Sequence, residues 1–255
     1  MKRLLSLLVL GTLLSSSINA QLWKMRRYEA SAGIGTTQFF GDIGGFSRGE
    51  NILGLKDISF HHTRININGS VQYRILADLT AKLNLNFGSF HSTDARGSNE
   101  ARSFESRTLF FEPAITGEYY IIRNKGDESF QLMKGSSYPF PKRFFPMLDV
   151  YLFTGIGGLS YSVKPNDKLE AYVTESKGFV PVIPAGIGAS LTYSGTYNIG
   201  VELGGRYTFS DNIDGYTSQY SGSNDMYYIL NFFFTYKIKT NEKGVPAFLH
   251  KNGRY

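Results

Sequence analysis

Histidine, serine and acidic residues are the side chains of this sequence that could perform hydrolytic chemistry. His61 and His62 are adjacent, and His91 directly precedes Ser92. A serine nucleophile needs a base within hydrogen-bond reach and a third group that orients this base. No acidic residue of the sequence can be assigned as that third group. The sequence has no cysteine, which excludes thiolate zinc sites and cysteine nucleophiles. We therefore expect no catalytic residues.

A second candidate for chemistry is the acidic segment Asp211-Asn212-Ile213-Asp214-Gly215. Carboxylate oxygens are the ligands that divalent cations such as Ca²⁺ take in proteins. This segment lacks the spacing of a calcium-binding loop, however. Asp and Asn side chains also accept hydrogen bonds from the backbone two residues further on, which forms a turn. We expect such a turn here, and predict neither a metal nor a cofactor.

The remaining charged residues belong to segments in which polar and apolar residues alternate. In each strong segment every second residue is apolar or glycine, a pattern that predicts a half-buried β-strand. The strong segments are 64–75, 79–87, 198–209 and 227–238; the weaker ones are 28–35, 109–121 and 182–193. An eighth segment, 145–159, resembles a strand but does not reveal which face is apolar. Each segment has roughly the 9–11 residues that a tilted membrane strand requires.

The two faces of these strands differ in charge. The apolar face carries no charged residue, whereas the polar face carries charges of both signs. They are Glu29, Arg64, Arg74, Lys82, Glu112, Glu118, Glu202, Arg206 and Lys237. Opposite charges in nearly equal numbers suit a closed interior in which the groups pair with one another. The sequence thus predicts an all-β fold, an eight-stranded up-and-down antiparallel transmembrane β-barrel with a charge network in its lumen.

A soluble β-sandwich or lipocalin-like barrel would also show alternation, with the apolar face inside. Three features favour the membrane: an export signal, many Asn, Gly, Ser and Thr residues on the polar face, and aromatic residues near the ends of the apolar bands. These aromatic residues are Tyr28, Phe87, Tyr119, Tyr193, Phe209 and Tyr236. Eight strands enclose a lumen just wide enough for side chains. We therefore expect no general diffusion channel.

The chain divides into four predicted segments. Residues 1–20 have a basic start, an apolar stretch over Leu4–Leu14 and a small-residue end at Ala20, which predicts a signal peptide. We assign 21–27 to a periplasmic N-terminal segment, 28–239 to the outer-membrane barrel and 240–255 to a periplasmic tail. No later segment has the ~18 apolar residues of a membrane-spanning helix.

In this topology three connections face the periplasm, at 76–78, 123–143 and 194–197, and four face outward, at 41–63, 91–106, 161–179 and 210–225. The connection 123–143 is too long for a hairpin, and Pro139 and Pro141 prevent strand pairing there. We predict that it binds a periplasmic partner together with the tail 239–255. The predicted contact residues are Tyr138, Phe140, Lys142, Arg143, Phe144 and Phe145. Basic residues prevail on this side, which favours an acidic partner, and nucleic acid is not expected.

Several motifs resemble those of one known family. Tyr28–Gly35 followed by Phe40-Gly41-Asp42-Ile43-Gly44-Gly45 looks like the opening strand and first loop of PorG-like barrels of the type IX secretion system. Tyr151–Gly157, Ile183–Gly188 and Gly200–Asp211 agree in content and order. The resemblance implies a barrel that ties a periplasmic ring, built from the PorK lipoprotein and PorN, to the outer membrane.

The function expected from the sequence is therefore that of a non-enzymatic outer-membrane anchor, with ring proteins and outer-membrane lipid as partners. A lipid-modifying outer-membrane barrel enzyme is one alternative, and a narrow channel or a surface-binding barrel is another. The long inner connection favours the anchor. A histidine, a serine and an acid gathered on one rim would favour the enzyme.

Overall fold

The computed structural model describes residues 26–45, 60–95, 99–124, 128–133, 145–173, 175–218, 224–240 and 245–246. The predicted signal peptide lies outside these residues, as does most of the segments 21–27 and 240–255. No helix in the described part of the chain is long and apolar enough to cross a membrane.

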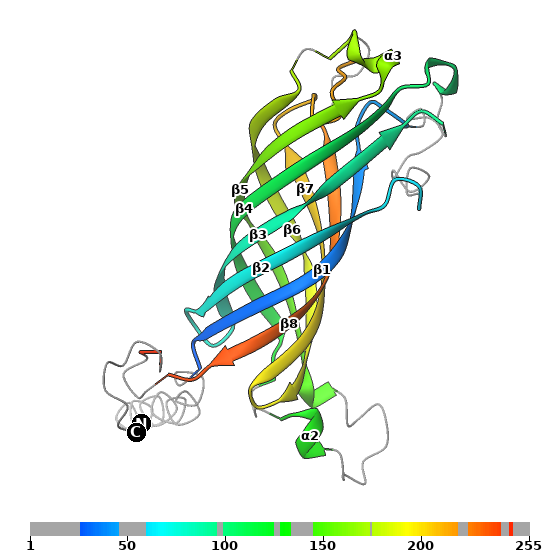
Figure 1. The fold of residues 1–255 in the computed structure, drawn as a ribbon. Coiled ribbons are helices and arrows are strands. Elements are labelled where there is room, and N and C mark those ends of the chain that lie inside the picture. The colour runs from blue at the N-terminus through cyan, green and yellow to red at the C-terminus, as the bar shows by residue number, and fades with distance from the viewer. Residues whose placement is uncertain are drawn as a thin grey trace, which may run out of the picture.

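Eight antiparallel strands form a closed barrel in the order of the chain, and β1 pairs with β8 to close it (Figure 1). The strands are β1 Tyr28–Phe40, β2 Arg64–Arg74, β3 Leu79–Thr93, β4 Glu105–Ile122, β5 Leu148–Pro165, β6 Lys177–Ser194, β7 Tyr197–Thr208 and β8 Met226–Ile238. Four short helices lie in the described parts of the connections: η3 Glu100–Arg102, α2 Phe130–Met133, η4 Phe145–Met147 and α3 Asp167–Glu170.

The strands present apolar side chains to the outside of the barrel and most polar side chains to its lumen. In β8, Phe232 and Phe234 are about half exposed, whereas Asn231 and Thr235 are buried. Such a belt of exposed apolar side chains is stable in contact with lipid. A closed barrel also leaves no strand edge with unpaired backbone groups in the hydrocarbon. The predicted fold class is confirmed, and the barrel lies in the outer membrane.

Five predicted strands stop too early at the rim away from Tyr28 and Ile238, which we call the outer rim. β1 continues to Phe40, β3 to Thr93 and β5 to Pro165, while β4 begins at Glu105 and β6 at Lys177. The predicted outer connections 91–106 and 161–179 are therefore wrong at their ends, because the strands leave only 94–104 and 166–176 outside them.

The reason is that inward-facing residues near the outer rim are also apolar. Phe90, Phe110 and Leu159 are at most 1% exposed and point into the lumen. Apolar residues then stand on both faces of the strand, so the alternation disappears from the sequence although the strand continues. For the same reason, the sequence of β5 did not reveal which of its residues face the lumen.

The wall of the barrel is uneven in length. β4, β5 and β6 have 18 residues each, whereas β2 has 11 and β7 has 12. A strand of 18 residues is roughly 60 Å long at about 3.3 Å per residue, well beyond the ~25 Å apolar band of such barrels. Figure 1 shows these long strands rising to the outer rim, where α3 follows β5.

The assignment of faces can be tested at two neighbouring residues of β7. Leu203 is 47% exposed toward lipid and Glu202 is 3% exposed in the lumen. We expect Leu203→Arg to lower the yield of folded barrel, because a charge at the bilayer midplane costs about 2–4 kcal/mol. Glu202→Gln should assemble, since the amide keeps the size of the side chain. The measurement is the fraction of membrane-bound protein whose migration on a gel changes on boiling. A lower folded fraction for Glu202→Gln than for Leu203→Arg would show that the two faces are assigned the wrong way round.

Candidate functional site

The inner half of the lumen, nearer Tyr28 and Ile238, contains a buried lysine between two carboxylates. Lys82 Nζ lies 2.6 Å from Glu202 Oε2 and 3.1 Å from Glu118 Oε1. The Tyr151 hydroxyl donates a second hydrogen bond to Glu202 Oε2 at 3.0 Å. The three charged side chains come from β3, β4 and β7 and are at most 3% exposed. The contact between Lys82 and Glu202 therefore connects β3 with β7, which are not neighbours in the wall.

A second ion pair lies further toward the outer rim. Arg206 Nε of β7 is 3.5 Å from Glu112 Oε1 of β4. Asn86 Nδ2 donates to the same oxygen at 3.0 Å, and the Tyr227 hydroxyl donates to Glu112 Oε2. Every side chain of this group is buried. A buried charge is tolerated only when it is paired and hydrogen-bonded, and here both conditions hold for Glu112.

A third group of charges lies at the inner end of the lumen. Arg74 Nη2 is 3.4 Å from Glu29 Oε1, and Lys237 is buried in the same wall. Asp149 is also buried here and accepts a hydrogen bond from the Asn124 backbone N–H at 2.8 Å. A cavity of about 10 Å³ between these groups has room for about one water molecule.

Eight of the nine charged residues predicted for the lumen thus face it. Arg64 does not join them: its guanidinium donates to the carbonyl oxygens of His61 and Thr63 at the outer rim. Arg64 is the first residue of β2, so its long side chain is free to turn away from the lumen. Sequence reasoning missed Asp149, because the faces of β5 could not be read.

The outer half of the lumen is filled by apolar side chains. Phe90 and Phe110 stack with ring centroids 4.3 Å apart. Ile213, from the connection between β7 and β8, is completely buried among them, and its carbonyl accepts a hydrogen bond from Thr108 Oγ1 at 2.8 Å. The lumen is therefore filled with apolar side chains in its outer half and with paired charges in its inner half. This filling disfavours the narrow-channel alternative.

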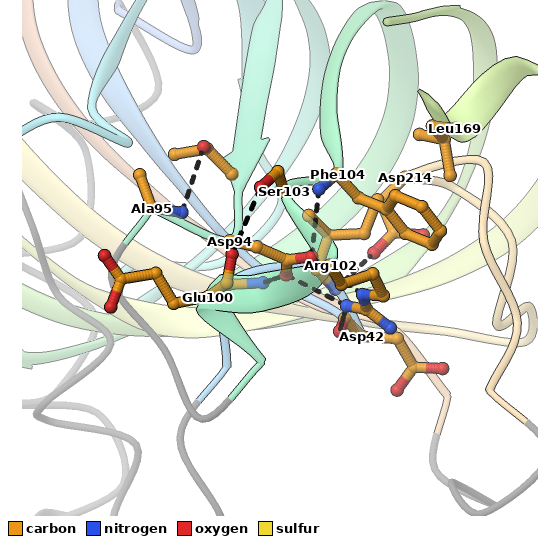
Figure 2. A network of polar contacts seen from close by, with 12 residues as sticks. Asp42, Asp94, Ala95, Glu100, Arg102, Ser103, Phe104, Leu169 and Asp214 are labelled. Atoms are coloured by element: carbon orange, nitrogen blue, oxygen red, sulfur yellow. Dashed lines mark hydrogen bonds and ion pairs between the residues drawn. The ribbon is translucent and has the colours of Figure 1, made fainter. Parts of the chain in front are cut away.

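The outer connections form a cap over this rim, centred on Asp94 and Arg102 (Figure 2). Asp94 accepts hydrogen bonds from Arg102 Nε at 2.7 Å, from the Gly44 backbone N–H at 2.9 Å and from the Phe104 backbone N–H at 3.1 Å. The hydrogen bond of Arg102 with Asp94 raises the pKa of Arg102 above its ordinary value. The Arg102 guanidinium also lies 4.7 Å from the Phe104 ring and 4.6 Å from the Tyr216 ring. Three outer connections therefore meet at one arginine.

Two further carboxylates of the cap surround Gly41. Asp214 Oδ1 accepts from the Tyr216 N–H at 3.0 Å, the turn expected from the sequence, and its Oδ2 accepts from the Ile43 N–H at 3.1 Å. Asp225 Oδ2 accepts from the Ile213 N–H at 2.8 Å. Among the described residues, no group of three or more His, Asp or Glu side chains is arranged to hold a metal ion.

Burial controls the protonation of these carboxylates. It raises the pKa of Asp214 to about 7, with further contributions from Asp42 and Asp211, and it raises the pKa of Asp225 well above its ordinary value. Burial and the neighbouring Asp42 raise the pKa of Asp211 to about 6. The folded cap therefore binds protons more tightly than the unfolded chain does.

The histidines and the serine considered for catalysis do not form a triad. His91 and Ser92 are successive residues of β3, so their side chains point to opposite faces of the wall. His91 Nε2 lies 3.7 Å from Glu105 Oε1, whereas Ser92 is buried on the lumen side. The His62 and His91 ring centroids are 6.3 Å apart. This geometry disfavours the enzyme alternative.

The predicted partner surface is described only in part. Tyr138, Phe140, Lys142, Arg143 and Phe144 lie outside the described residues, and Phe145 is 58% exposed at the start of η4.

The described part of the same connection exposes two apolar residues that the sequence did not single out. They lie on α2, where Phe130 is 40% exposed and Leu132 is 78% exposed. The Phe130 ring stacks on Tyr193 of β6 at a centroid distance of 5.9 Å. Asn124 Nδ2 donates to the Glu128 carbonyl at 2.6 Å and to Thr192 Oγ1 of β6 at 3.2 Å, which holds the chain next to α2 against the barrel.

Residues 142–239 match a protein family described as a domain of unknown function, DUF6089. No curated protein matches the sequence significantly. Among solved structures, the chain is similar to Neisserial surface protein A, with a TM-score of 0.44 and 11% identity over 82% of this chain and 96% of that one. It is also similar to the N-terminal β-barrel domain of Pseudomonas aeruginosa OprF, with a TM-score of 0.42 and 9% identity over 83% and 97% of the two chains. For Ail of Yersinia pestis the TM-score is 0.41 at 10% identity, over 83% and 97%. These similarities concern the fold alone.

The raised pKa values predict that the cap weakens as the pH rises. A carboxyl group whose folded-state pKa exceeds its ordinary value of 3.8 contributes stability at low pH, and this contribution is lost as the pH rises through about 7. We expect the backbone amide of Ile43 to exchange hydrogen at least about ten-fold faster at pH 8 than at pH 5.5, after correction for intrinsic rates, since one pKa unit corresponds to about 1.4 kcal/mol. Asp214→Asn should remove most of this dependence; an unchanged dependence in that variant would contradict the assignment.

The cap should also be sensitive to a single methyl group at Gly41. A Cβ atom there would lie 2.6 Å from Asp214 Oδ2 and 2.7 Å from Asp225 Oδ1. We expect Gly41→Ala to destabilise the cap by about 1–3 kcal/mol, the usual cost of overpacking. Gly69→Ala is the matched control, because an added methyl group there meets no atom within 4 Å. Limited proteolysis of the outer connections measures the effect, and equal cleavage of both variants would refute it.

Proposed function

We propose that this protein is a non-enzymatic outer-membrane barrel that anchors a periplasmic ring of the type IX secretion system. The observation that carries the proposal is the connection 123–147 between β4 and β5, which exposes apolar side chains at the inner end of a filled barrel. The other two inner connections, 75–78 and 195–196, are short turns.

Exposed apolar side chains on the aqueous side of a barrel support a protein partner. Leu132 and Phe145 are 78% and 58% exposed, although a monomer gains nothing from leaving such groups in water. Aromatic residues are enriched in protein interfaces, and the buried centre of an interface is more apolar than the rest of the protein surface. The hydrogen bonds of Asn124 hold this connection against the barrel, so the surface is positioned before a partner binds.

The filled lumen supports a structural role. Paired charges and packed aromatic rings occupy the lumen at two levels, so the barrel is better suited to hold an assembly than to conduct a solute. The sequence resemblance to PorG-like barrels supplies the identity of the partners, ring proteins of the PorK and PorN type. Lys142 and Arg143 would steer an acidic surface of such a partner toward the connection.

The proposal is tested by shortening this one connection. We expect a variant in which residues 125–138 are replaced by a short Gly-Ser turn to fold as a heat-modifiable barrel but to lose the ring proteins on affinity purification and to stop secretion. A variant with 46–59 of an outer connection replaced in the same way is the control and should retain both properties.

A single substitution refines the same test. Leu132→Asp should weaken co-purification by about ten-fold, since it places an unpaired carboxylate where the partner would bury an apolar side chain. Normal secretion by the variant with residues 125–138 replaced, in which the folded barrel is present at wild-type abundance, would contradict the anchoring proposal.

A further inference from the structure

The outward face of the long strands carries three cations at the upper edge of the apolar band. Arg107 of β4, Lys164 of β5 and Lys177 of β6 are all exposed, and we call them the basic cluster. The pairing register sets their positions: Arg107 is opposite Lys164, and Lys177 is opposite Ser162 of β5. The basic cluster therefore spans three adjacent strands within two rows of the sheet.

Two cavities lie one above the other at this place. The upper cavity, about 400 Å³, is lined by Arg64, His91, Glu105, Arg107 and Lys164, among others. The lower cavity, about 590 Å³, is an open groove lined by the apolar residues Phe87, Leu109 and Phe111, by Ser160 and Ser162, and by Lys177 at its upper end.

The lower cavity exists because β5 presents small residues between bulkier neighbours. Ser160 is opposite Phe111 of β4 on one side and Phe179 of β6 on the other. In the row above, Ser162 is opposite Leu109 and Lys177. The two serines form the floor of a groove on the lipid-facing surface, with apolar walls below and the basic cluster above.

The charge of the basic cluster is not neutralised within the barrel. None of its three side chains forms an ion pair with another residue in the described part of the chain. Glu105 is the carboxylate that lines the upper cavity, and its Oε1 lies 3.7 Å from His91 Nε2. The two cavities therefore combine an excess of positive charge with an apolar groove.

The basic cluster is confined to one side of the barrel. At the outer ends of β7, β8 and β1, the lipid-facing residues are aromatic and uncharged: Tyr207, Tyr228 and Phe40. The Phe40 and Tyr228 rings pack edge to face at 5.4 Å, as in an aromatic girdle. If these basic residues only extended their charged ends into water at the membrane surface, they could occur all around the barrel and without a groove beside them.

We propose that these two cavities bind one phosphorylated lipid of the outer leaflet. Arg107, Lys164 and Lys177 hold the phosphate, and an acyl chain lies in the groove over Ser160 and Ser162. Arginine and lysine are the side chains that recognise phosphate, through charge-assisted hydrogen bonds. These bonds gain strength next to hydrocarbon, where the effective dielectric constant is low. The site is independent of the periplasmic anchoring role.

The test uses the full-length barrel in detergent, with native mass spectrometry to count bound lipids. The probes are phosphatidic acid and phosphatidylcholine with identical acyl chains, so that only the headgroup differs: an anionic phosphate monoester in the first and a zwitterionic phosphodiester in the second. We expect the wild-type barrel to bind one phosphatidic acid with at least about ten-fold preference over phosphatidylcholine. Equal binding of the two lipids would overturn the proposal.

Two variants separate the phosphate from the acyl chain. Arg107→Gln with Lys164→Gln should abolish the preference, whereas Lys168→Gln with Lys239→Gln removes the same charge from exposed positions elsewhere and should preserve it. Ser160→Trp fills the groove and leaves the basic cluster intact, so it should weaken phosphatidic acid binding in a barrel that remains heat-modifiable.

The remaining outcomes concern specificity and the source of the phosphate. Preference retained by the Arg107/Lys164 variant, or lost equally in the Lys168/Lys239 control, would show that the basic cluster is not the site. Inorganic phosphate should fail to displace phosphatidic acid, because it has no chain to occupy the groove. If inorganic phosphate at equal concentration displaced phosphatidic acid completely, and Ser160→Trp did not weaken phosphatidic acid binding, a lipid ligand would be excluded.

Discussion

The structure depends on one constraint: lipid offers no hydrogen-bond partner to the backbone, so the edge of β1 must be paired with the edge of β8. Closing the sheet after eight strands fixes the width of the lumen, which is then just large enough for side chains. The sheet consequently has two environments that differ from those of a soluble barrel. Apolar residues face outward into lipid, and the interior has to be filled by the chain itself.

The interior is filled by two different kinds of chemistry, and each accounts for a distinct property. In the inner half of the lumen, Lys82, Glu118 and Glu202 neutralise one another, and the contact of Lys82 with Glu202 joins β3 to β7 across the lumen. Toward the outer rim, aromatic rings and Ile213 from an outer connection occupy the same cross-section. Above them, Asp214 and Asp225 of the cap are protonated more easily than a free aspartate. Burial raises the pKa of these carboxyl groups by more than their backbone hydrogen bonds lower it.

The sequence revealed those parts of the barrel where alternation is undisturbed. Leu203 and Glu202 could be placed correctly because β7 alternates along its length. The outer ends could not, since residues such as Phe110 are apolar on the lumen side too. Ion-pair partners were also beyond sequence reasoning: Lys82 and Glu202 are 120 positions apart, and their meeting depends on the stagger of the strands. Asp94 and Arg102 lie in connections, where no periodicity marks them.

The uneven strand lengths have a mechanical consequence for an anchor. The inner connection 123–147 leaves the barrel from β4 and returns through β5, two of the three longest strands. A pulling force on this connection acts along the axes of these strands and loads their hydrogen bonds in shear, so that many bonds share the tension at once. β4 is held by β3 over fifteen residue pairs and β5 by β6 over thirteen. The periplasmic connection is thus attached at the part of the wall that resists extraction best.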